Sequence, residues 1–323
     1  MLAVLTAIPL LAWLYLLLAH GRFWRADQIL PHEQDALSSY PPVAVVIPAR
    51  NEADGIARTI QGLLSQDYSG QISVWLVDDS SDDGTADIAR DAAQGDQRLT
   101  VIENQPLVPG WAGKMWAVNT GLKAVPADNV YVLLTDADII HEPGLLRRLV
   151  TKSENEGLVL TSLMVRLNCE TVWEKLLIPA FVFFFQKLYP FPRVNNPKQQ
   201  IAAAAGGCML IRKSALDAVG GVTRIRDAII DDCALARLLK KQGQIWPGLA
   251  EQTRSLRQYT YLHEIWDMVA RTAYTQLNHS PVLLIGSVLG MIVLYLMPVV
   301  SLVCGLLAGD SAIALPAAFT LSL

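Results

Sequence analysis

The chain has 323 residues, which is enough for about two folding units, and its 26 Lys and Arg against 30 Asp and Glu give a formal net charge of -4. This balance excludes a broad nucleic-acid-binding surface. Residues 1–19 carry no charged side chain and residues 280–323 carry only Asp310. We therefore expect a globular middle flanked by membrane-embedded ends.

The first apolar run predicts an N-terminal transmembrane helix over residues 1–20. Its length is close to that needed to cross about 30 Å of hydrocarbon. Arg22 and Arg25 follow the run rather than precede it, which is typical of a signal anchor and not of a cleaved signal. The positive-inside rule then places the amino terminus outside and the following domain in the cytoplasm. A buried helix is the alternative, but the run is apolar all round.

Residues 42–166 alternate short apolar runs with helical patterns, which is typical of a parallel sheet with crossover helices. We predict strands at 43–49, 72–79, 99–104, 130–138 and 158–165. We predict helices at 52–64, 84–93, 112–123 and 143–153. No G-x-G-x-x-G or P-loop motif occurs, so a dinucleotide oxidoreductase and a P-loop NTPase are disfavoured. The cysteines form no C-x-x-C pair, so a zinc site or redox dithiol lacks support.

Carboxylates follow two of the predicted strands, at the sheet edge where ligands bind in such folds. Asp136 and Asp138, in T-D-A-D, end the fourth strand and can converge on one Mg²⁺ or Mn²⁺. Such a cation neutralises a diphosphate leaving group. Asp78 and Asp79 end the second strand, where a carboxylate can bind a ribose or a base edge. Turns and helix caps use the same residues, so each pair also has a purely structural interpretation.

The segment 172–192 combines aromatic and aliphatic residues with prolines and is too short and interrupted to span a membrane. We interpret it as an interfacial helix, with Lys175 and Lys187 toward lipid head groups. A buried core helix is the alternative. A second interfacial helix is predicted over residues 259–279, where aromatic residues suit the same belt.

Asp231 and Asp232 open the helical stretch A-L-A-R-L-L-K-K. Adjacent carboxylates disfavour joint ionisation, which raises the pKa of one of them toward the operating pH. The alternative is an acidic pair that interacts with the helix dipole. Gly206 and Gly207 would let the backbone approach a ligand closely, or mark a bulge.

Residues 281–308 form a second apolar run, in which Pro298 is tolerable as a kink. Basic residues before the run place its start in the cytoplasm as well. A third apolar run after Asp310 is too short to cross unaided. We predict a C-terminal transmembrane region over residues 281–323, in which either the chain ends within a membrane hairpin or the sequence stops short of its natural end.

Five motifs, in order along the chain, resemble family 2 glycosyltransferases of GT-A fold: PARNE (48–52), VDDSSDDGT (77–85), GWAGKMWAVNTG (110–121), TDAD (135–138) and IDDCAL (230–235). The likeness is greatest to membrane-anchored lipid glycosyltransferases, the ceramide glucosyltransferase-like group and especially hopanoid-biosynthesis-associated enzymes. It covers roughly residues 42–280. It implies an α/β, Rossmann-like GT-A domain over residues 42–250 with flanking transmembrane helices, in a multi-pass protein of the cytoplasmic membrane.

The resemblance assigns roles position by position. Donor-binding positions match at Pro48, Arg50, Glu52, Asp78, Asp79, Lys114 and Asp136. Asp138 is the stronger candidate for a direct metal ligand, with Asp136 beside it. Asp232 matches the catalytic base and Asp231 its support. Lys114 matches a basic residue near the phosphates, although an exposed lysine at a helix start is the plain alternative.

The chain departs from the related enzymes after the base. They usually carry Q/R-x-x-R-W, whereas residues 268–272 read M-V-A-R-T. Arg271 remains and would clamp the diphosphate. The missing tryptophan argues against a processive polysaccharide synthase, which would stack a growing sugar chain on it.

The sequence thus predicts an inverting, metal-dependent glycosyltransferase that moves a sugar from a nucleotide-sugar, a UDP-sugar by preference, to a membrane lipid hydroxyl such as that of a hopanoid. Inversion is implied by the resemblance alone. Its partners would be the bilayer and the lipid acceptor, and no nucleic acid. A ceramide-like lipid, a carotenoid or polyprenyl phosphate are alternative acceptors, and a non-catalytic membrane scaffold is the alternative function.

Overall fold

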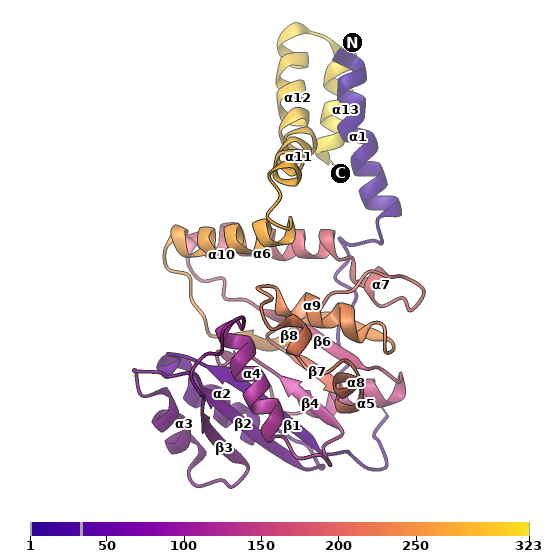
Figure 1. Cartoon of the computed structure of the whole chain (residues 1–323). Helices are drawn as coiled ribbons and strands as arrows, with labels where there is room; N and C mark the ends of the chain where they lie inside the picture. Colours follow the sequence, from indigo (N-terminus) through magenta and orange to yellow (C-terminus); the bar gives the residue numbers. More distant parts are fainter. Residues whose placement is uncertain (1, 33–34, 323) are drawn as a thin grey trace. The chain divides into compact units, whose positions relative to one another are not determined.

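The computed structural model describes residues 2–32 and 35–322. The chain divides into two compact units (Figure 1). The helical unit comprises Met1–Arg25 and Trp266–Leu323, and the α/β unit comprises Ala26–Ile265. The α/β unit is therefore wider on both sides than the predicted domain of residues 42–250.

The α/β unit is built on one eight-stranded sheet with the order β3-β2-β1-β4-β7-β6-β8-β5. The strands are β1 (Val43–Ala49), β2 (Ile72–Asp78), β3 (Leu99–Glu103), β4 (Tyr131–Leu134), β5 (Ile139–Ile140), β6 (Leu160–Arg166), β7 (Met209–Arg212) and β8 (Ile245–Ser255). The strands β1 to β4 pair in parallel.

The prediction of a wholly parallel sheet is wrong beyond β4. The strand β7 runs antiparallel to both β4 and β6, between which it lies. The strand β7 lies after residues 42–166, and the prediction rested on the alternating pattern of those residues alone. The sheet is therefore mixed, and the predicted strand at 158–165 does not lie next to the one before it.

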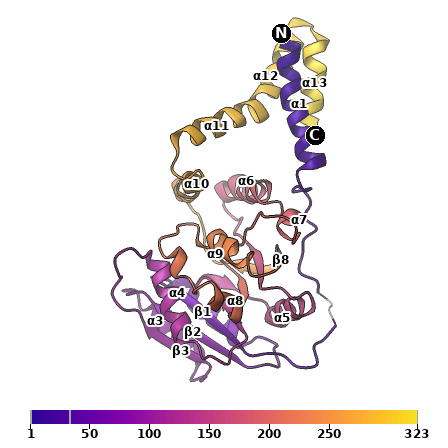
Figure 2. The same ribbon diagram turned by 45° about the vertical axis from the view of Figure 1, so that its right-hand side comes forward.

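Helices cover both faces of the sheet (Figures 1 and 2). The strand β1 shows why, because its apolar side chains alternate between two cores. Val43, Val45 and Ile47 belong to one core, and Ala44 and Val46 to the other. The first core is completed by α2 (Ala53–Leu64), α3 (Thr85–Ala93) and α5 (Leu145–Asn155). The second is completed by α4 (Gly113–Ala124), α8 (Lys213–Ala218), the 3-10 turn Thr223–Ile225 and α9 (Asp231–Leu239).

The predicted elements between residues 42 and 166 correspond to observed ones, and all but one agree within two residues at each end. The exception is the fourth strand, which ends at Leu134 and not at residue 138. Thr135 to Asp138 leave the sheet, which frees the two carboxylates of this segment from the ladder.

The helix α6 (Val172–Leu188) continues through Pro179, and the short helix α7 (Phe191–Val194) follows it. A capping box joins Thr171 and Glu174 at the start of α6. Glu174 and Ile178 are the buried residues of α6. The alternative of a core helix therefore does not fit α6.

The helical unit contains α1 (Leu2–Ala19), α11 (Pro281–Met291), a π-helical turn (Ile292–Leu296), α12 (Met297–Ala308) and α13 (Ser311–Ser322), and most of α10 (Leu262–Gln276). The helix α1 lies beside α13 (Figures 1 and 2). Within the described residues, one helical stretch, Pro281–Ala308, is long and apolar enough to cross a bilayer, and Ala7–Ala19 and Ser311–Ser322 are shorter apolar helices.

Pro298 interrupts this long stretch as expected of a helix-breaking residue. It has no N–H to donate to the carbonyl oxygen four residues before it, which is that of Leu294. The indole N–H of Trp13 donates to this oxygen instead, at 3.0 Å. A side chain of α1 thus satisfies the backbone group that Pro298 leaves without its usual helical donor.

Gly121 allows α4 to lie directly on β1 and β2. A Cβ at Gly121 would come within 2.5 Å of Val46 Cγ1 and 3.0 Å of Val77 Cγ2. We predict that Gly121→Ala lowers the free energy of unfolding by about 1–3 kcal/mol through overpacking. The midpoint of thermal unfolding measures this loss.

The matched control for this prediction is Val46→Ala, which removes the methyl group that the new Cβ would meet. The double variant should lose less stability than the sum of the two single variants. Additive losses would contradict the assigned contact.

Candidate active site

The site begins where β1 and β4 separate. Their register ends at the pair Val46 and Leu134, whereas β1 continues beside β2 to Ala49. Pro48 lies in this free part of β1, so its missing N–H breaks no hydrogen bond to β4. The strand order reverses direction at β1, and a crevice forms outside the carboxyl ends of strands at such a point.

Two loops at this edge hold each other in place. Asn51 N–H donates to the Ser81 hydroxyl at 2.9 Å, and Asp82 N–H donates to Asn51 Oδ1 at 3.1 Å. Asn51 and Ser80 both adopt positive φ angles, of 55° and 62°. Non-glycine residues in this region are uncommon and concentrate at functional sites. The loops that follow β1 and β2 therefore hold each other in one conformation at the edge of the site.

The two aspartates at the end of β2 have different surroundings. The Asp78 carboxylate is buried and accepts hydrogen bonds from the backbone and hydroxyl of Ser81. Asp79 accepts a hydrogen bond from Asn104 Nδ2 at 2.7 Å and lies 3.9 Å from Arg50 Nη1. A Cβ at Gly113, the first residue of α4, would lie 3.2 Å from Asp79 Oδ2. Asp78 therefore holds its own loop, and Asp79 is the one of the pair that contacts neighbouring segments.

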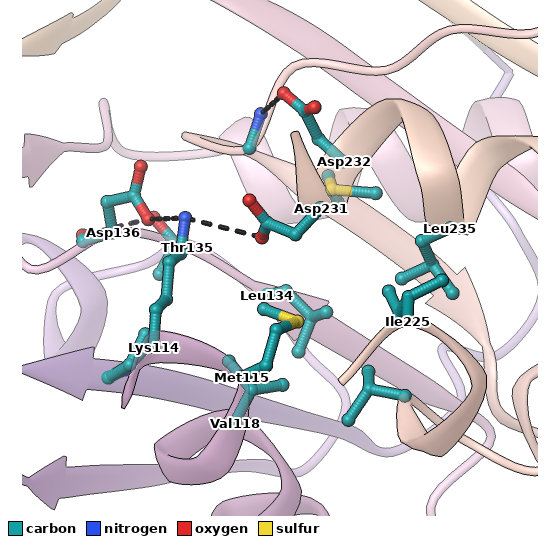
Figure 3. Close-up of a pocket in the computed structure, with 14 residues that line it drawn as sticks. Lys114, Met115, Val118, Leu134, Thr135, Asp136, Ile225, Asp231, Asp232 and Leu235 are labelled. Atoms are coloured by element: carbon teal, nitrogen blue, oxygen red, sulfur yellow. Dashed lines mark hydrogen bonds and ion pairs between the residues drawn. The ribbon is translucent and has the colours of Figure 1, made fainter. Parts of the chain in front are cut away.

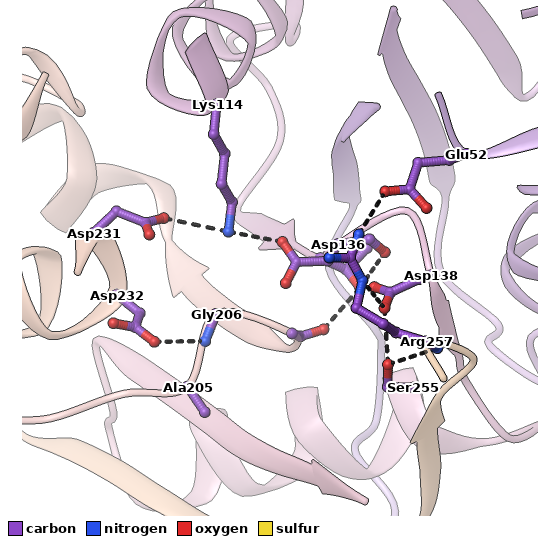
Figure 4. Close-up of polar contacts among 12 residues, drawn as sticks. Glu52, Lys114, Asp136, Asp138, Ala205, Gly206, Asp231, Asp232, Ser255 and Arg257 are labelled. Carbon is purple, nitrogen blue, oxygen red and sulfur yellow. Dashed lines mark hydrogen bonds and ion pairs between the residues drawn. The ribbon is translucent and has the colours of Figure 1, made fainter. Parts of the chain in front are cut away.

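Lys114 joins three separate elements (Figure 4). Its Nζ atom lies 2.8 Å from Asp136 Oδ1, after β4, and 3.5 Å from Asp231 Oδ2, on α9. Burial lowers the pKa of Lys114, but the nearby Asp136, Asp231 and Asp232 raise it more, and the net pKa is well above the ordinary value. Lys114, although its side chain is 41% exposed, is therefore a cation that is paired on two sides.

Asp232 is held by two backbone donors. Gly206 N–H donates to its Oδ2 at 2.9 Å, and Cys233 N–H donates to its Oδ1 at 2.6 Å. Burial, followed by the charge of Asp231, raises the pKa of Asp232 to about 6. A Cβ at Gly206 would lie 3.4 Å from Lys114 Nζ, so this turn approaches the site closely. A carboxylate with this pKa and fixed orientation suits a general base near neutral pH.

The pocket next to this cluster is small (Figure 3). Apolar side chains of α4, β4 and α9 line it opposite the carboxylates, among them Met115, Val118 and Leu235. Its volume of about 10 Å³ is room for about one water molecule. This enclosed space is therefore too small for a substrate.

Arg257 enters the site from the segment after β8, and sequence analysis did not assign it to the site. Its Nη2 lies 3.3 Å from Glu52 Oε1, and its Nε lies 3.8 Å from Asp138 Oδ2. Ser255 also donates to Asp138 Oδ2, at 2.8 Å. Burial and the charge of Asp136 raise the pKa of Asp138, although the Ser255 hydrogen bond and Arg257 oppose them. No local motif marks Arg257, because its partners precede it by more than 100 residues.

A buried carboxylate fixes the segment that carries Arg257. Glu174, at the start of α6, accepts hydrogen bonds from Tyr259 N–H at 2.7 Å and from Thr171 N–H at 2.8 Å. Burial alone would raise the pKa of Glu174, but these backbone donors lower it to about 2. The Thr171 hydroxyl donates to the Tyr259 carbonyl oxygen at 3.1 Å. The first turn of α6 therefore holds both backbone polar groups of Tyr259.

Arg271 is the predicted site residue that the α/β unit does not contain. It lies on the part of α10 that belongs to the helical unit. Its role at a diphosphate stays a prediction.

The assembled site carries an excess of negative charge. Glu52, Asp136, Asp138, Asp231 and Asp232 supply five carboxylates, against the two cations Lys114 and Arg257, so the formal charge is -3 when all are ionised. The described residues contain no group of three or more His, Cys, Asp or Glu placed to hold a metal ion. The acidic side chains of the site therefore fit a hard divalent cation only if one or two of their carboxylates bind it and a phosphate and water supply the other oxygen ligands.

Comparison with known proteins identifies the domain. Residues 44–220 match the family model described as Glycosyl transferase family 2. The β-monoglucosyldiacylglycerol synthase of Trichormus variabilis is 26% identical over 207 residues, which are 63% of this chain and 42% of that protein. The undecaprenyl-phosphate 4-deoxy-4-formamido-L-arabinose transferase of Edwardsiella ictaluri is 34% identical over 116 residues, 35% of this chain and 34% of that protein.

Among solved structures, the mannosyltransferase PcManGT from Pyrobaculum calidifontis, in complex with GDP-Man and Mn²⁺, superposes with a TM-score of 0.59. It is 21% identical, and the match covers 82% of this chain and 71% of that chain. This likeness shows the fold. The chain spans less than half the length of the curated relatives described above.

Lys114→Met tests the charge arrangement without any ligand. In buffer with a chelator at pH 8, we expect a loss of about 1 kcal/mol, or roughly 2–4 °C in the midpoint of thermal unfolding. Without Lys114 the carboxylates around it repel each other more strongly. Lowering the pH to 5 protonates Asp232, whose pKa is about 6, so the difference from the wild type should shrink.

Lys123→Met is the matched control, because Lys123 lies on the same helix and is exposed. Its effect should be small and the same at both pH values. A Lys114→Met deficit that does not depend on pH would contradict the ion pairs described here.

Proposed function

The chain belongs to glycosyl transferase family 2, and on this premise we propose that it transfers a sugar from a nucleoside-diphosphate donor to a hydroxyl group of a membrane lipid. The observation that carries this proposal is that Lys114 pairs with Asp136 on one side and with Asp231 on the other, next to Asp232, whose pKa is raised. Family membership makes the donor a nucleotide-sugar, and a UDP-sugar is our first candidate.

The donor half of the site would bind the nucleotide and its phosphates. The loops after β1 and β2, with Pro48, Arg50 and Asp79, would hold the nucleoside. A divalent cation held by Asp138, with Asp136 beside it, would supply positive charge to the leaving diphosphate. Lys114 and Arg257 present two further cations from opposite sides of this position, which stabilise negative charge as it develops on the phosphate.

The acceptor half of the site would activate the attacking hydroxyl. Asp232 takes the proton while the acceptor oxygen attacks the anomeric carbon and the bond to the diphosphate breaks. Asp231 raises the pKa of Asp232 and pairs with Lys114. A direct attack by the acceptor, with Asp232 as the base, would invert the anomeric centre.

Three observations support a lipid acceptor and a membrane location. One similar protein is a β-monoglucosyldiacylglycerol synthase by name. The stretch Pro281–Ala308 exposes large apolar side chains, including Val282, Ile285 and Leu307. The helix α6 exposes Val172 and Leu176. An exposed apolar surface of this kind is stable in a lipid environment and costly in water.

We propose from these observations that the chain is anchored at both ends in the cytoplasmic membrane, with α6 and the 259–279 segment at the interface. A hopanoid hydroxyl is our first acceptor candidate on the strength of the motif resemblance. A ceramide-like lipid, a carotenoid and polyprenyl phosphate are the alternatives within the same reaction. A contact of Arg271 with the diphosphate is proposed on the motif resemblance alone.

The test is the release of nucleoside diphosphate from a panel of nucleotide-sugars, with Mg²⁺ or Mn²⁺ and with or without bacterial lipid extract. We predict lipid-stimulated release from one donor. Asp232→Asn should lower kcat by about 10²–10⁴-fold and leave donor binding intact. The kcat of the wild type should fall below pH 6, because protonation of Asp232 removes the base.

Several outcomes would count against this function. Donor binding without release, in the presence of lipid, would favour the scaffold. Equal kcat values for Asp232→Asn and the wild type would remove Asp232 as the base. Release that is unaffected by any lipid would reject the lipid acceptor.

A further inference from the structure

A buried hydroxyl lies at the junction of the donor and acceptor halves of the site. Thr135, the residue before the metal motif, is 1% exposed. Its Oγ1 lies 2.8 Å from the Gly207 carbonyl oxygen and 2.8 Å from His141 Nε2. A longer contact of 3.4 Å reaches the Asp136 carbonyl oxygen. The proposed chemistry does not use Thr135 or His141.

The proton positions follow from the partners. A carbonyl oxygen only accepts, so the single hydroxyl proton of Thr135 goes to Gly207, and His141 Nε2 must donate to Thr135. Burial lowers the pKa of His141 to about 4, so the ring stays neutral with its proton on Nε2. Its buried Nδ1 has no hydrogen-bond partner in the described structure. His141 is thus held in one tautomer and orients the Thr135 hydroxyl toward Gly207.

The turn that accepts the Thr135 hydrogen bond also contacts the proposed base. Gly207 follows Gly206, whose N–H donates to Asp232 Oδ2 at 2.9 Å. From the other side, the Ser162 hydroxyl on β6 donates to the Ala205 carbonyl oxygen at 3.1 Å and accepts from Ala205 N–H at 2.9 Å. The 205–207 turn is therefore fixed by one buried hydroxyl on each side, and the Thr135 hydroxyl belongs to the segment that carries Asp136 and Asp138.

We propose that Thr135 is a positioning residue that sets the distance between the metal motif and the catalytic base through its hydrogen bond to Gly207. This inference rests on the proposed function, because it assigns Asp232 and the metal motif to two halves of one reaction. Without the Thr135 hydroxyl, the 205–207 turn keeps its hydrogen bonds to the other buried hydroxyl and to Asp232 but loses the one to Thr135. The distance between the donor and Asp232 is then no longer fixed. Donor binding uses groups on one side of this junction only and should survive.

The experiment compares Thr135→Val, which keeps the shape and loses the hydroxyl, with Thr135→Ser, which keeps the hydroxyl. In the full chain with Mn²⁺ and lipid extract, we expect Thr135→Val to lower kcat by about 10- to 100-fold, since small displacements of reacting groups cost that much. The Kd and the KM for the donor should change by less than about threefold, because the groups proposed to bind the donor stay in place. Thr135→Ser should recover most of kcat.

Thr161→Val is the matched control. Thr161 is equally buried, and its hydroxyl pairs with that of Ser153 at 2.6 Å, away from the site. Both valine variants remove a buried hydrogen-bond partner, so both should lose stability. Only Thr135→Val should lose turnover. If both lose turnover equally, Thr135 has a merely structural role.

Hydrogen exchange gives a readout that does not depend on activity. The peptide that covers residues 205–207 should exchange faster in Thr135→Val than in the wild type, Thr135→Ser or Thr161→Val. Unchanged exchange together with unchanged kcat would overturn the inference. If the wild type releases no nucleoside diphosphate from any donor, the proposed function fails by itself, and the exchange result still decides whether Thr135 fixes the turn.

Discussion

The interaction on which the site depends is the pairing of Lys114 with Asp136 on one side and Asp231 on the other. These carboxylates come from opposite sides of the crevice, and without a cation between them they would repel each other. Lys114 reduces this repulsion but does not cancel it, because the formal charge of the site remains -3. A diphosphate adds negative charge, so a divalent cation is the natural complement of this site.

The sheet brings these charges together. The strand β4 stops at Leu134 while β1 continues, which leaves Thr135 to Asp138 free to turn into the crevice. The antiparallel strand β7 follows the 205–207 turn and pairs with β4, so that turn lies beside the end of β4. The N-terminus of α9 then presents Asp231 and Asp232 to the same place. A mixed sheet thus positions the proposed metal motif and the proposed base, which are about 95 residues apart in the sequence.

The features that sequence analysis predicted are local ones. The periodicity of apolar residues defined the strands and helices between residues 42 and 166, and the acidic motifs with Lys114 lie together in the structure. The position of β7, the contacts of Arg257 and the bond from Thr135 to Gly207 were not predicted, because each joins segments more than 70 residues apart. Pairing between distant segments depends on the tertiary fold and leaves no spacing pattern in the sequence.

We propose that this site binds a nucleoside diphosphate tightly only with a divalent cation, despite Lys114 and Arg257. The most direct measurement is the Kd for UDP, and for GDP beside it, by calorimetry on the purified full chain with Mn²⁺ and then with excess chelator. We expect the chelator to weaken binding by at least about tenfold, a difference of about 1.4 kcal/mol, and Asp138→Asn to do the same with Mn²⁺ present. Equal affinity with and without the cation would contradict this proposal.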